Sequence, residues 1–143
     1  MKVYLDNCCF NRPYDDQDSL IIRIETEVKL EIQDRVRSGI INLVWSYILD
    51  FENSQNPYVE RSKEIIEWKK IAVENIIENE SVLIRMRGYE KLGIKSKDAL
   101  HISSAVQANC SYFITVDKGI LNKRNLVQNI KICNPIEFIE EQE

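Results

Sequence analysis

The chain has 143 residues, of which 44% are hydrophobic and 29% are charged, with only four Gly and three Pro. This length and composition are typical of a single domain over residues 1–143, and they exclude long flexible linkers. The net charge of −4 is explained by solubility alone, so binding to nucleic acid would need local basic patches or bound cations.

Targeting signals are not evident in the chain. The apolar runs are far shorter than a membrane span, and an acidic residue at position 6 comes too early for a signal peptide. We therefore expect a cytoplasmic protein that does not engage a membrane.

The first third of the chain alternates between strand and helix patterns. Residues 2–5 are β-prone and predict a first strand. A proline and an acidic run at 13–18 mark a loop and a helix start. Apolar residues then recur every three or four positions over 20–36, which predicts a long amphipathic helix. A buried strand is predicted at 40–45, with Ser46 as the N-cap of the helix that follows.

The middle of the chain predicts two helices and a strand. Apolar spacing indicates a helix from near Pro57 to Ile77, because proline is favoured in a first helical turn. A short strand is expected at 81–84, and a short helix at 85–92 is closed by Gly93.

The last third repeats the alternation. Ser96 is expected to cap a helix over 97–109, and strands are predicted at 112–116 and 130–133, before a last short helix at 134–139. Strands that alternate with helices predict an α/β fold with a parallel sheet covered on both faces.

Acidic residues follow or open several of the apolar runs. Asp6 and Asp117 end predicted strands, Asp98 lies in the first turn of a helix, and Glu52 lies in the helix after the second strand. Ligands of such folds bind at the carboxyl ends of the strands, where the strand order switches. We expect the four acids to reach one point there, and we expect the helix dipole to keep the pKa of Asp98 low.

Carboxylates without Cys or His partners favour Mg²⁺ or Mn²⁺ over zinc. Such an ion suits hydrolysis of a phosphodiester, because it polarises a phosphoryl oxygen and activates a bound water. Thr115 points to the same side of its predicted strand as Asp117, so its hydroxyl is expected to support a carboxylate or a metal-bound water. With one His and no Cys-x-x-Cys pair, a zinc site is poorly supported, and we expect reduced, buried cysteines at Cys8, Cys9, Cys110 and Cys133.

Four segments, at 2–6, 46–52, 97–102 and 113–117, resemble the motifs of PIN-domain proteins in the order of that family. The resemblance covers nearly the whole chain, and Lys-Asp-Ala-Leu-His-Ile at 97–102 is its most specific piece. PIN domains are the fold of many prokaryotic toxin ribonucleases and RNA-processing nucleases.

The resemblance implies a three-layer α/β/α sandwich around a parallel sheet of about five strands. It also implies a Mg²⁺- or Mn²⁺-dependent endoribonuclease with Asp6, Glu52, Asp98 and Asp117 as its catalytic and metal-binding set. The implied partners are an RNA substrate, a second copy of the chain in a homodimer and, if the protein is the toxin of a toxin-antitoxin pair, a small antitoxin protein.

One position departs from the family pattern. Many relatives have Asn two residues after the first Asp, where this chain has Cys8, and Asn7 comes one residue early. Neighbouring side chains of an extended segment point apart, so Asn7 is a candidate supporting residue in an altered position. This departure motivates an alternative function, a catalytically weakened PIN-fold module that binds RNA or protein.

Other polar residues have less specific patterns. His101 shares a helix face with Asp98, and a packed, hydrogen-bonded role is favoured over that of a general base. Asp50 is expected to be a cap or solvent-exposed group that faces away from Glu52. Six basic residues are expected to flank the cleft and to contact the RNA backbone as a group: Arg12, Lys95, Lys97, Lys118, Lys123 and Arg124.

Overall fold

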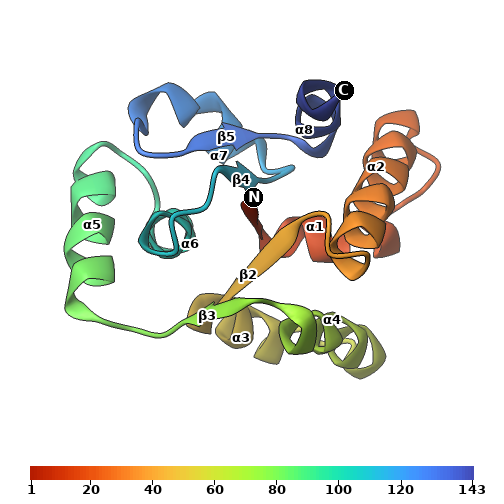
Figure 1. Cartoon of the computed structure of the whole chain (residues 1–143), viewed down its shortest axis with the longest axis horizontal. Coiled ribbons are helices and arrows are strands. Elements are labelled where there is room, and N and C mark those ends of the chain that lie inside the picture. The colour runs from red at the N-terminus through yellow and green to blue at the C-terminus, as the bar shows by residue number, and fades with distance from the viewer.

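A five-stranded sheet lies at the centre of the computed structural model, which describes residues 1–143 (Figure 1). Every neighbouring pair of strands is parallel, and the order across the sheet is β3-β2-β1-β4-β5. The parallel sheet expected from the alternating pattern is therefore confirmed. The strands are β1 (Lys2–Leu5), β2 (Asn42–Ser46), β3 (Glu74–Ile76), β4 (Tyr112–Ile114) and β5 (Lys131–Cys133).

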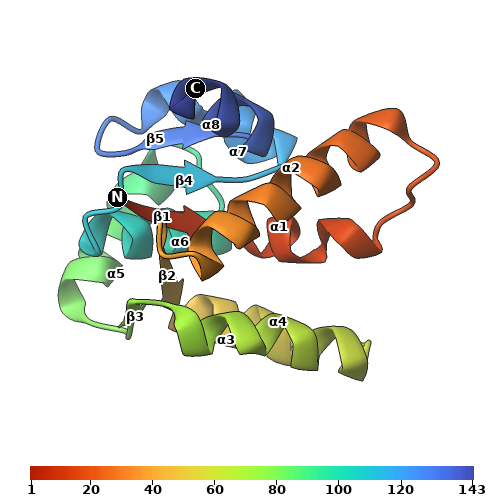
Figure 2. The same cartoon turned by 45° about the vertical axis from the view of Figure 1, so that its right-hand side comes forward.

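Helices cover both faces of the sheet, as expected. Helices α5 and α6 pack on each other on one side, while α1 and α2 lie on the other side and α2 packs against α8 (Figures 1 and 2). None of the helices combines the length and the apolar character needed to pass through a bilayer. Their bounds are α1 (Asn7–Asn11), α2 (Leu20–Arg37), α3 (Tyr47–Ser54), α4 (Val59–Ile71), α5 (Glu80–Lys91), α6 (Ser96–Gln107), α7 (Lys118–Asn122) and α8 (Pro135–Gln142), with 3₁₀ turns at Arg12–Tyr14 and Arg124–Leu126.

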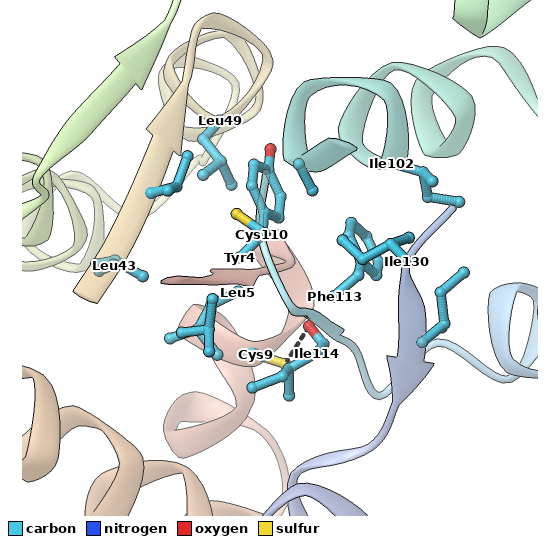
Figure 3. Close-up of a cluster of buried hydrophobic side chains, with 14 of the residues drawn as sticks. Tyr4, Leu5, Cys9, Leu43, Leu49, Ile102, Cys110, Phe113, Ile114 and Ile130 are labelled. Atoms are coloured by element: carbon cyan, nitrogen blue, oxygen red, sulfur yellow. Dashed lines mark hydrogen bonds between the residues drawn. The ribbon is translucent and has the colours of Figure 1, made fainter. Parts of the chain in front are cut away.

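The core is built around the central strand β1. Tyr4 and Leu5 are fully buried, because a central parallel strand is covered on both faces (Figure 3). The Tyr4 ring stacks on Phe113 of the neighbouring strand β4, with ring centroids 5.4 Å apart. Cys9 at the start of the chain donates from its thiol to the carbonyl of Ile114, which ties α1 to the end of β4 (Figure 3). All four cysteines are free. Cys9, Cys110 and Cys133 are buried as predicted, whereas Cys8, also expected to be buried, is partly exposed.

The third strand differs from the prediction. Residues 81–84, expected as a strand, belong to α5, and the sheet instead takes β3 from a segment expected to continue the preceding helix. Asn79 caps α5 by accepting a hydrogen bond from the amide of Val82. Helix α4 ends at Ile71, and pairing of the next residues with β2 outweighs their helical spacing.

Three smaller predictions are also wrong. Lys95, and not Ser96, is the N-cap of α6, and the Ser96 hydroxyl bonds Glu90 instead. Strand β4 ends at Ile114, so the two residues expected at its end, Thr115 and Val116, lie beyond it. The segment from Asn7 to Tyr14, expected to be extended or a loop, forms α1 and a 3₁₀ turn. By contrast, the predicted long helix and the Ser46 cap are confirmed.

Candidate active site

The strand order reverses at β1. The chain proceeds from β1 outward to β2 and β3, then returns to the other side of β1 with β4 and β5. In open α/β sheets, ligands bind in the crevice at the carboxyl ends of the strands at such a switch point. Asp6 and Asp117 lie there, just beyond β1 and β4, and Asp98 and Glu52 join them from α6 and α3. All four acids line one open groove of about 350 Å³.

Asp6 is held in a fixed orientation by its neighbours. It is 6% exposed, and its Oδ1 accepts a hydrogen bond of 2.8 Å from the amide of Asn7. Its Oδ2 accepts from the Thr115 hydroxyl at 2.8 Å and from the Cys8 thiol at 3.3 Å. The Thr115 oxygen in turn accepts from the amide of Asp117 at 3.0 Å. Thr115 therefore connects two of the acids through its hydroxyl.

The arrangement of Asn7 and Cys8 corrects the expectation of an extended segment. Both lie in the first turn of α1, which brings the Cys8 thiol to Asp6 and turns the Asn7 amide toward Glu52, at 3.3 Å from Oε2. Cys8 thus contributes a hydrogen-bond donor to Asp6 from the position where the family pattern has Asn. A thiol is a weaker donor than an amide.

A buried chain of hydrogen bonds fixes Glu52. His101, 1% exposed, bonds Glu52 through Nε2. The Nδ1 of His101 lies 2.6 Å from the Tyr4 hydroxyl, which in turn lies 2.6 Å from the hydroxyl of Ser46, the cap of α3. The prediction of a packed, hydrogen-bonded His101 is confirmed, although its partner is one of the candidate catalytic acids.

His101 and Glu52 each stabilise the charged form of the other. Burial disfavours the charged form of His101, but the hydrogen bond to Glu52 and the nearby acids outweigh it and raise the pKa of His101. Burial similarly works to raise the pKa of Glu52, and the opposing contacts with His101, Lys97 and Asn7 lower it below its usual value. Glu52 is therefore ionised at neutral pH.

Asp98 behaves in the opposite way. Its side chain makes no hydrogen bond, and burial together with the negative charges of Asp6 and Asp117 raises its pKa to about 6. The expectation that the helix dipole keeps this pKa low is wrong, because desolvation and repulsion between the acids exceed the effect of the helix terminus. The Asp98 carboxylate forms no ion pair, and the nearby His101 offsets the rise of its pKa only in part.

Asp117 is the N-cap of α7, a helix that was not predicted from the sequence. Its Oδ1 accepts from the amides of Gly119 at 2.7 Å and Ile120 at 3.3 Å, which begins α7. A Cβ at Gly119 would come within 3.0 Å of that oxygen, so a glycine leaves room for the capped carboxylate. The Asp-x-Gly spacing after an apolar run was the available signal for this cap.

Of the six basic residues that were expected to flank the cleft, some form ion pairs with protein carboxylates and others do not. Lys97 lines the acidic groove, and Lys95 and Lys123 line a cavity beside it. Arg12 instead forms ion pairs with Glu25 and Asp15, and Arg124 pairs with Glu137, so these two are held by protein carboxylates. Lys118 makes no ion pair and follows Asp117 directly.

Asp50 lies outside the constellation. Its two carboxylate oxygens accept from the Trp45 indole at 2.9 Å and from Lys69 at 3.0 Å. The expectation that Asp50 faces away from Glu52 agrees with these contacts, although Asp50 is an ion-paired residue and not a cap.

The residues of the groove fit a hard divalent cation. No group of three His, Cys, Asp or Glu side chains is placed to coordinate one ion directly. Mg²⁺, however, usually keeps several waters and takes only one or two carboxylates from a protein. The oxygen-only donors and the unpartnered Asp98 suit such an ion, whereas the thiol of Cys8 and the ring of His101 are engaged with Asp6 and Glu52.

No protein-family model matches the sequence, and no curated protein sequence matches it. Solved structures do match the fold. The structure of VapBC-1 from nontypeable Haemophilus influenzae aligns with a TM-score of 0.60 over 95% of this chain and 99% of that chain, at 17% identity. The chain has a PIN-like α/β fold.

A second structure supports this assignment. VapBC2 from Rickettsia felis, bound to a DNA fragment from their promoter, aligns with a TM-score of 0.59 over 94% of this chain and 98% of that chain, at 14% identity. The PIN-like fold thus extends over nearly the whole length, and the family resemblance of the sequence motifs is confirmed at the level of fold.

Proposed function

We propose that this chain is a divalent-metal-dependent endoribonuclease that hydrolyses RNA phosphodiesters. The observation that supports it best is the groove at the strand switch point, where Asp6, Glu52, Asp98 and Asp117 gather without a balancing cation on Asp98. The PIN-like fold, shared with VapBC structures, supports the same class of reaction.

The polar residues of the groove divide into metal-holding, supporting and phosphate-attracting groups in this proposal. Asp6, Asp98 and Asp117 would hold Mg²⁺ or Mn²⁺, directly or through water. Such an ion supplies Lewis acidity at a phosphoryl oxygen and lowers the pKa of a bound water. Thr115 keeps Asp6 oriented through its 2.8 Å hydrogen bond, and Lys97 at the rim attracts the phosphate backbone.

Glu52 has a different environment from the three aspartates. Both of its oxygens are engaged, Oε1 by His101 and Oε2 by Asn7. We infer that Glu52 acts as an oriented, ionised carboxylate that accepts a hydrogen bond or orients water at the edge of the groove.

A cleavage assay tests the function. Purified protein with Mn²⁺ or Mg²⁺ should cleave single-stranded and structured RNA, and EDTA should abolish the cleavage. Asp98→Asn and Asp117→Asn should each lower kcat/KM by at least about 100-fold, as expected when charge at a metal site is removed. Asp34→Asn, on the exposed face of α2, is the matched control and should retain activity.

A second candidate is a PIN-fold module that binds RNA or protein without turnover. The absence of a ready three-ligand set and the engagement of both Glu52 oxygens favour it. RNA binding that is unaffected by divalent ions, with no cleavage by the wild type under any metal, would establish this candidate in place of the nuclease.

We further propose that the chain is the toxin of a toxin-antitoxin pair, since both matched structures are VapBC complexes. An open groove of about 700 Å³ between α2 and α4 suits a bound segment of an antitoxin. Two buried donors of α2, one turn apart, face it. The Lys29 ammonium has no carboxylate partner, and Nε2 of Gln33 has no hydrogen-bond partner. A partner segment with carbonyl or carboxylate groups would satisfy both.

Native purification followed by binding measurements tests this partnership. A small protein that copurifies should bind the wild type, and Lys29→Met or Gln33→Leu should weaken binding by at least about tenfold, because a buried donor loses its acceptor. Glu31→Gln, on the exposed side of the same helix, should leave binding unchanged. If the wild type and all three variants bind the copurified protein with equal affinity, the α2–α4 groove is excluded as the docking site.

A further inference from the structure

A second cavity lies beside the acidic groove and shares two acids with it. Asp98 and Asp117 line both spaces, so they form the boundary between them. The remaining wall is aliphatic and comes from α6, α7 and the segments around β5. Its apolar residues are all less than 10% exposed: Ile94, Ile102, Ile120, Val127 and Ile132.

We propose that this cavity, the base pocket, receives one nucleobase of the RNA, from a nucleotide adjacent to the scissile phosphate. The inference rests on the proposed ribonuclease function. A phosphate bound through a divalent ion at Asp98 and Asp117 would place a neighbouring base at the mouth of the pocket, because the two acids belong to both cavities.

The size of the base pocket favours a single planar group. Its water-accessible space is about 60 Å³. At roughly 10–15 Å³ for each water, this holds on the order of four to six waters, comparable with one aromatic ring and far too small for a peptide segment. Contact between the face of a base and the aliphatic wall removes apolar surface of both from water, which lowers the free energy of binding.

The positive charge at the rim of the base pocket favours a nucleotide over an uncharged aromatic molecule. Lys95 and Lys123 both line the pocket, and neither forms an ion pair, unlike the nearby Arg124. The Lys123 ammonium donates to the carbonyl of Gly93 at 2.6 Å, which holds it at the rim. Two ammonium groups that form no ion pair, beside an apolar pocket, are complementary to a nucleotide, whose base is flanked by phosphates.

The lining also predicts how selective the pocket is. No amide or hydroxyl side chain lines it, so the hydrogen-bonding edge of a base finds few specific side-chain partners there. Base identity is read through such partners, whereas contact with the face of a base is tolerant of sequence. We therefore expect the pocket to accept all four bases with affinities within a few-fold of each other.

Methyl NMR of the wild-type protein tests occupancy without requiring turnover. In Mg²⁺, uridine 5′-monophosphate should shift the methyl signals of Ile94, Ile120 and Ile132, while ribose 5-phosphate at the same concentration should not. The exposed Ile40 is the internal control. Isoleucine signals that do not move, or that move equally with both ligands, overturn the base pocket.

A cleavage assay on modified RNA tests the same inference in turnover. With Mn²⁺ and an RNA of known cleavage site, an abasic nucleotide on one side of that site should lower kcat/KM on the order of tenfold, and exchange among the four bases should change it only a few-fold. Val127→Phe, which fills the pocket, should remove the sensitivity to the abasic site. Val73→Phe, at the exposed edge of the sheet, should keep it.

The outcomes separate the two proposals. Cleavage that is insensitive to abasic nucleotides on both sides overturns the base pocket and leaves the ribonuclease standing. Isoleucine shifts specific to the nucleotide, without RNA cleavage by the wild type, support the pocket as a nucleotide site and overturn the ribonuclease. Because both measurements use the wild-type chain, they decide the matter even if Val127→Phe does not fold.

Discussion

The Thr115 hydroxyl joins Asp6, at the end of β1, to Asp117, beyond the end of β4. It is fully buried, donates to Asp6 and accepts from the amide of Asp117. Removing it would leave the amide of Asp117 unpaired and Asp6 Oδ2 with only the weak Cys8 thiol as a donor, and lost hydrogen bonds of this kind are costly when shielded from water.

Thr115→Val keeps the shape of the side chain and removes this hydroxyl. We expect the free energy of unfolding to fall by about 1–3 kcal/mol and the affinity for Mn²⁺ to fall by about tenfold or more. Urea unfolding and calorimetric titration measure the two effects. Thr115→Ser retains the hydroxyl and is the control; a valine variant with the Mn²⁺ affinity of the serine variant would contradict the supporting role.

His101 orients Glu52 from a position that no solvent reaches. His101→Gln should lower kcat by about 10–100-fold with a smaller change in KM, because the carboxylate loses its fixed position while the groove that binds RNA remains. The double variant with Glu52→Gln should lose little more than the worse single variant, since the two residues act as one unit. Strictly additive losses would show that His101 acts independently of Glu52.

At the scale of elements, α2 carries the most costly buried charge. Lys29 is 3% exposed, and burial lowers its pKa to about 8. Its ammonium lies 5.6 Å from the centroid of the Phe10 ring, a contact that only partly offsets the loss of water. We attribute this arrangement to the α2–α4 groove, where a bound partner would provide an acceptor.

Lys29→Met should stabilise the free protein by about 3 kcal/mol at pH 7, the free energy that corresponds to a pKa lowered from 10.5 to about 8. Between these two pKa values the unfolded chain binds more protons than the folded one, so the stability of the wild type rises with pH. The difference in the free energy of unfolding between the variant and the wild type should therefore decrease from about pH 8 to pH 10.5. Urea unfolding at several pH values checks this; a constant difference would contradict it.

At the scale of the whole molecule, the α/β fold gathers like charges that lie far apart in the chain. Burial, together with repulsion from Asp6 and Asp117, raises the pKa of Asp98 to about 6, so its ionised form destabilises the metal-free protein above that pH. A bound divalent ion would reverse this cost and stabilise the fold by an amount that grows with the logarithm of its free concentration above the Kd.

Asp98→Asn should accordingly raise the stability of the metal-free protein at pH 7.5 by about 1 kcal/mol, after allowance for screening of this half-exposed group. Mn²⁺ should raise the Tm of the wild type and leave the Tm of the variant nearly unchanged. Thermal unfolding in EDTA and in Mn²⁺ measures both, with Asp34→Asn as the control. An Asp98→Asn protein that keeps the full Mn²⁺ response would show that the ion binds elsewhere.

The sequence by itself determined most of the elements and the identity of the acids. The presence of strands at 2–5, 112–114 and 131–133 and of the helix over 20–37 was predictable, because hydrophobic periodicity and turn residues are local signals. The four acids were recognisable because each adjoins such a signal and matches a family motif.

Only the tertiary structure decided how those acids behave. The choice of Glu74–Ile76 as the third strand depends on pairing with β2 across the sheet, which no local pattern records. The raised pKa of Asp98, the hydrogen bond between His101 and Glu52, and the separation of free lysines from paired arginines arise from burial and from neighbours distant in the chain. Electrostatic and pairing energies depend on distances in space, and the fold sets those distances.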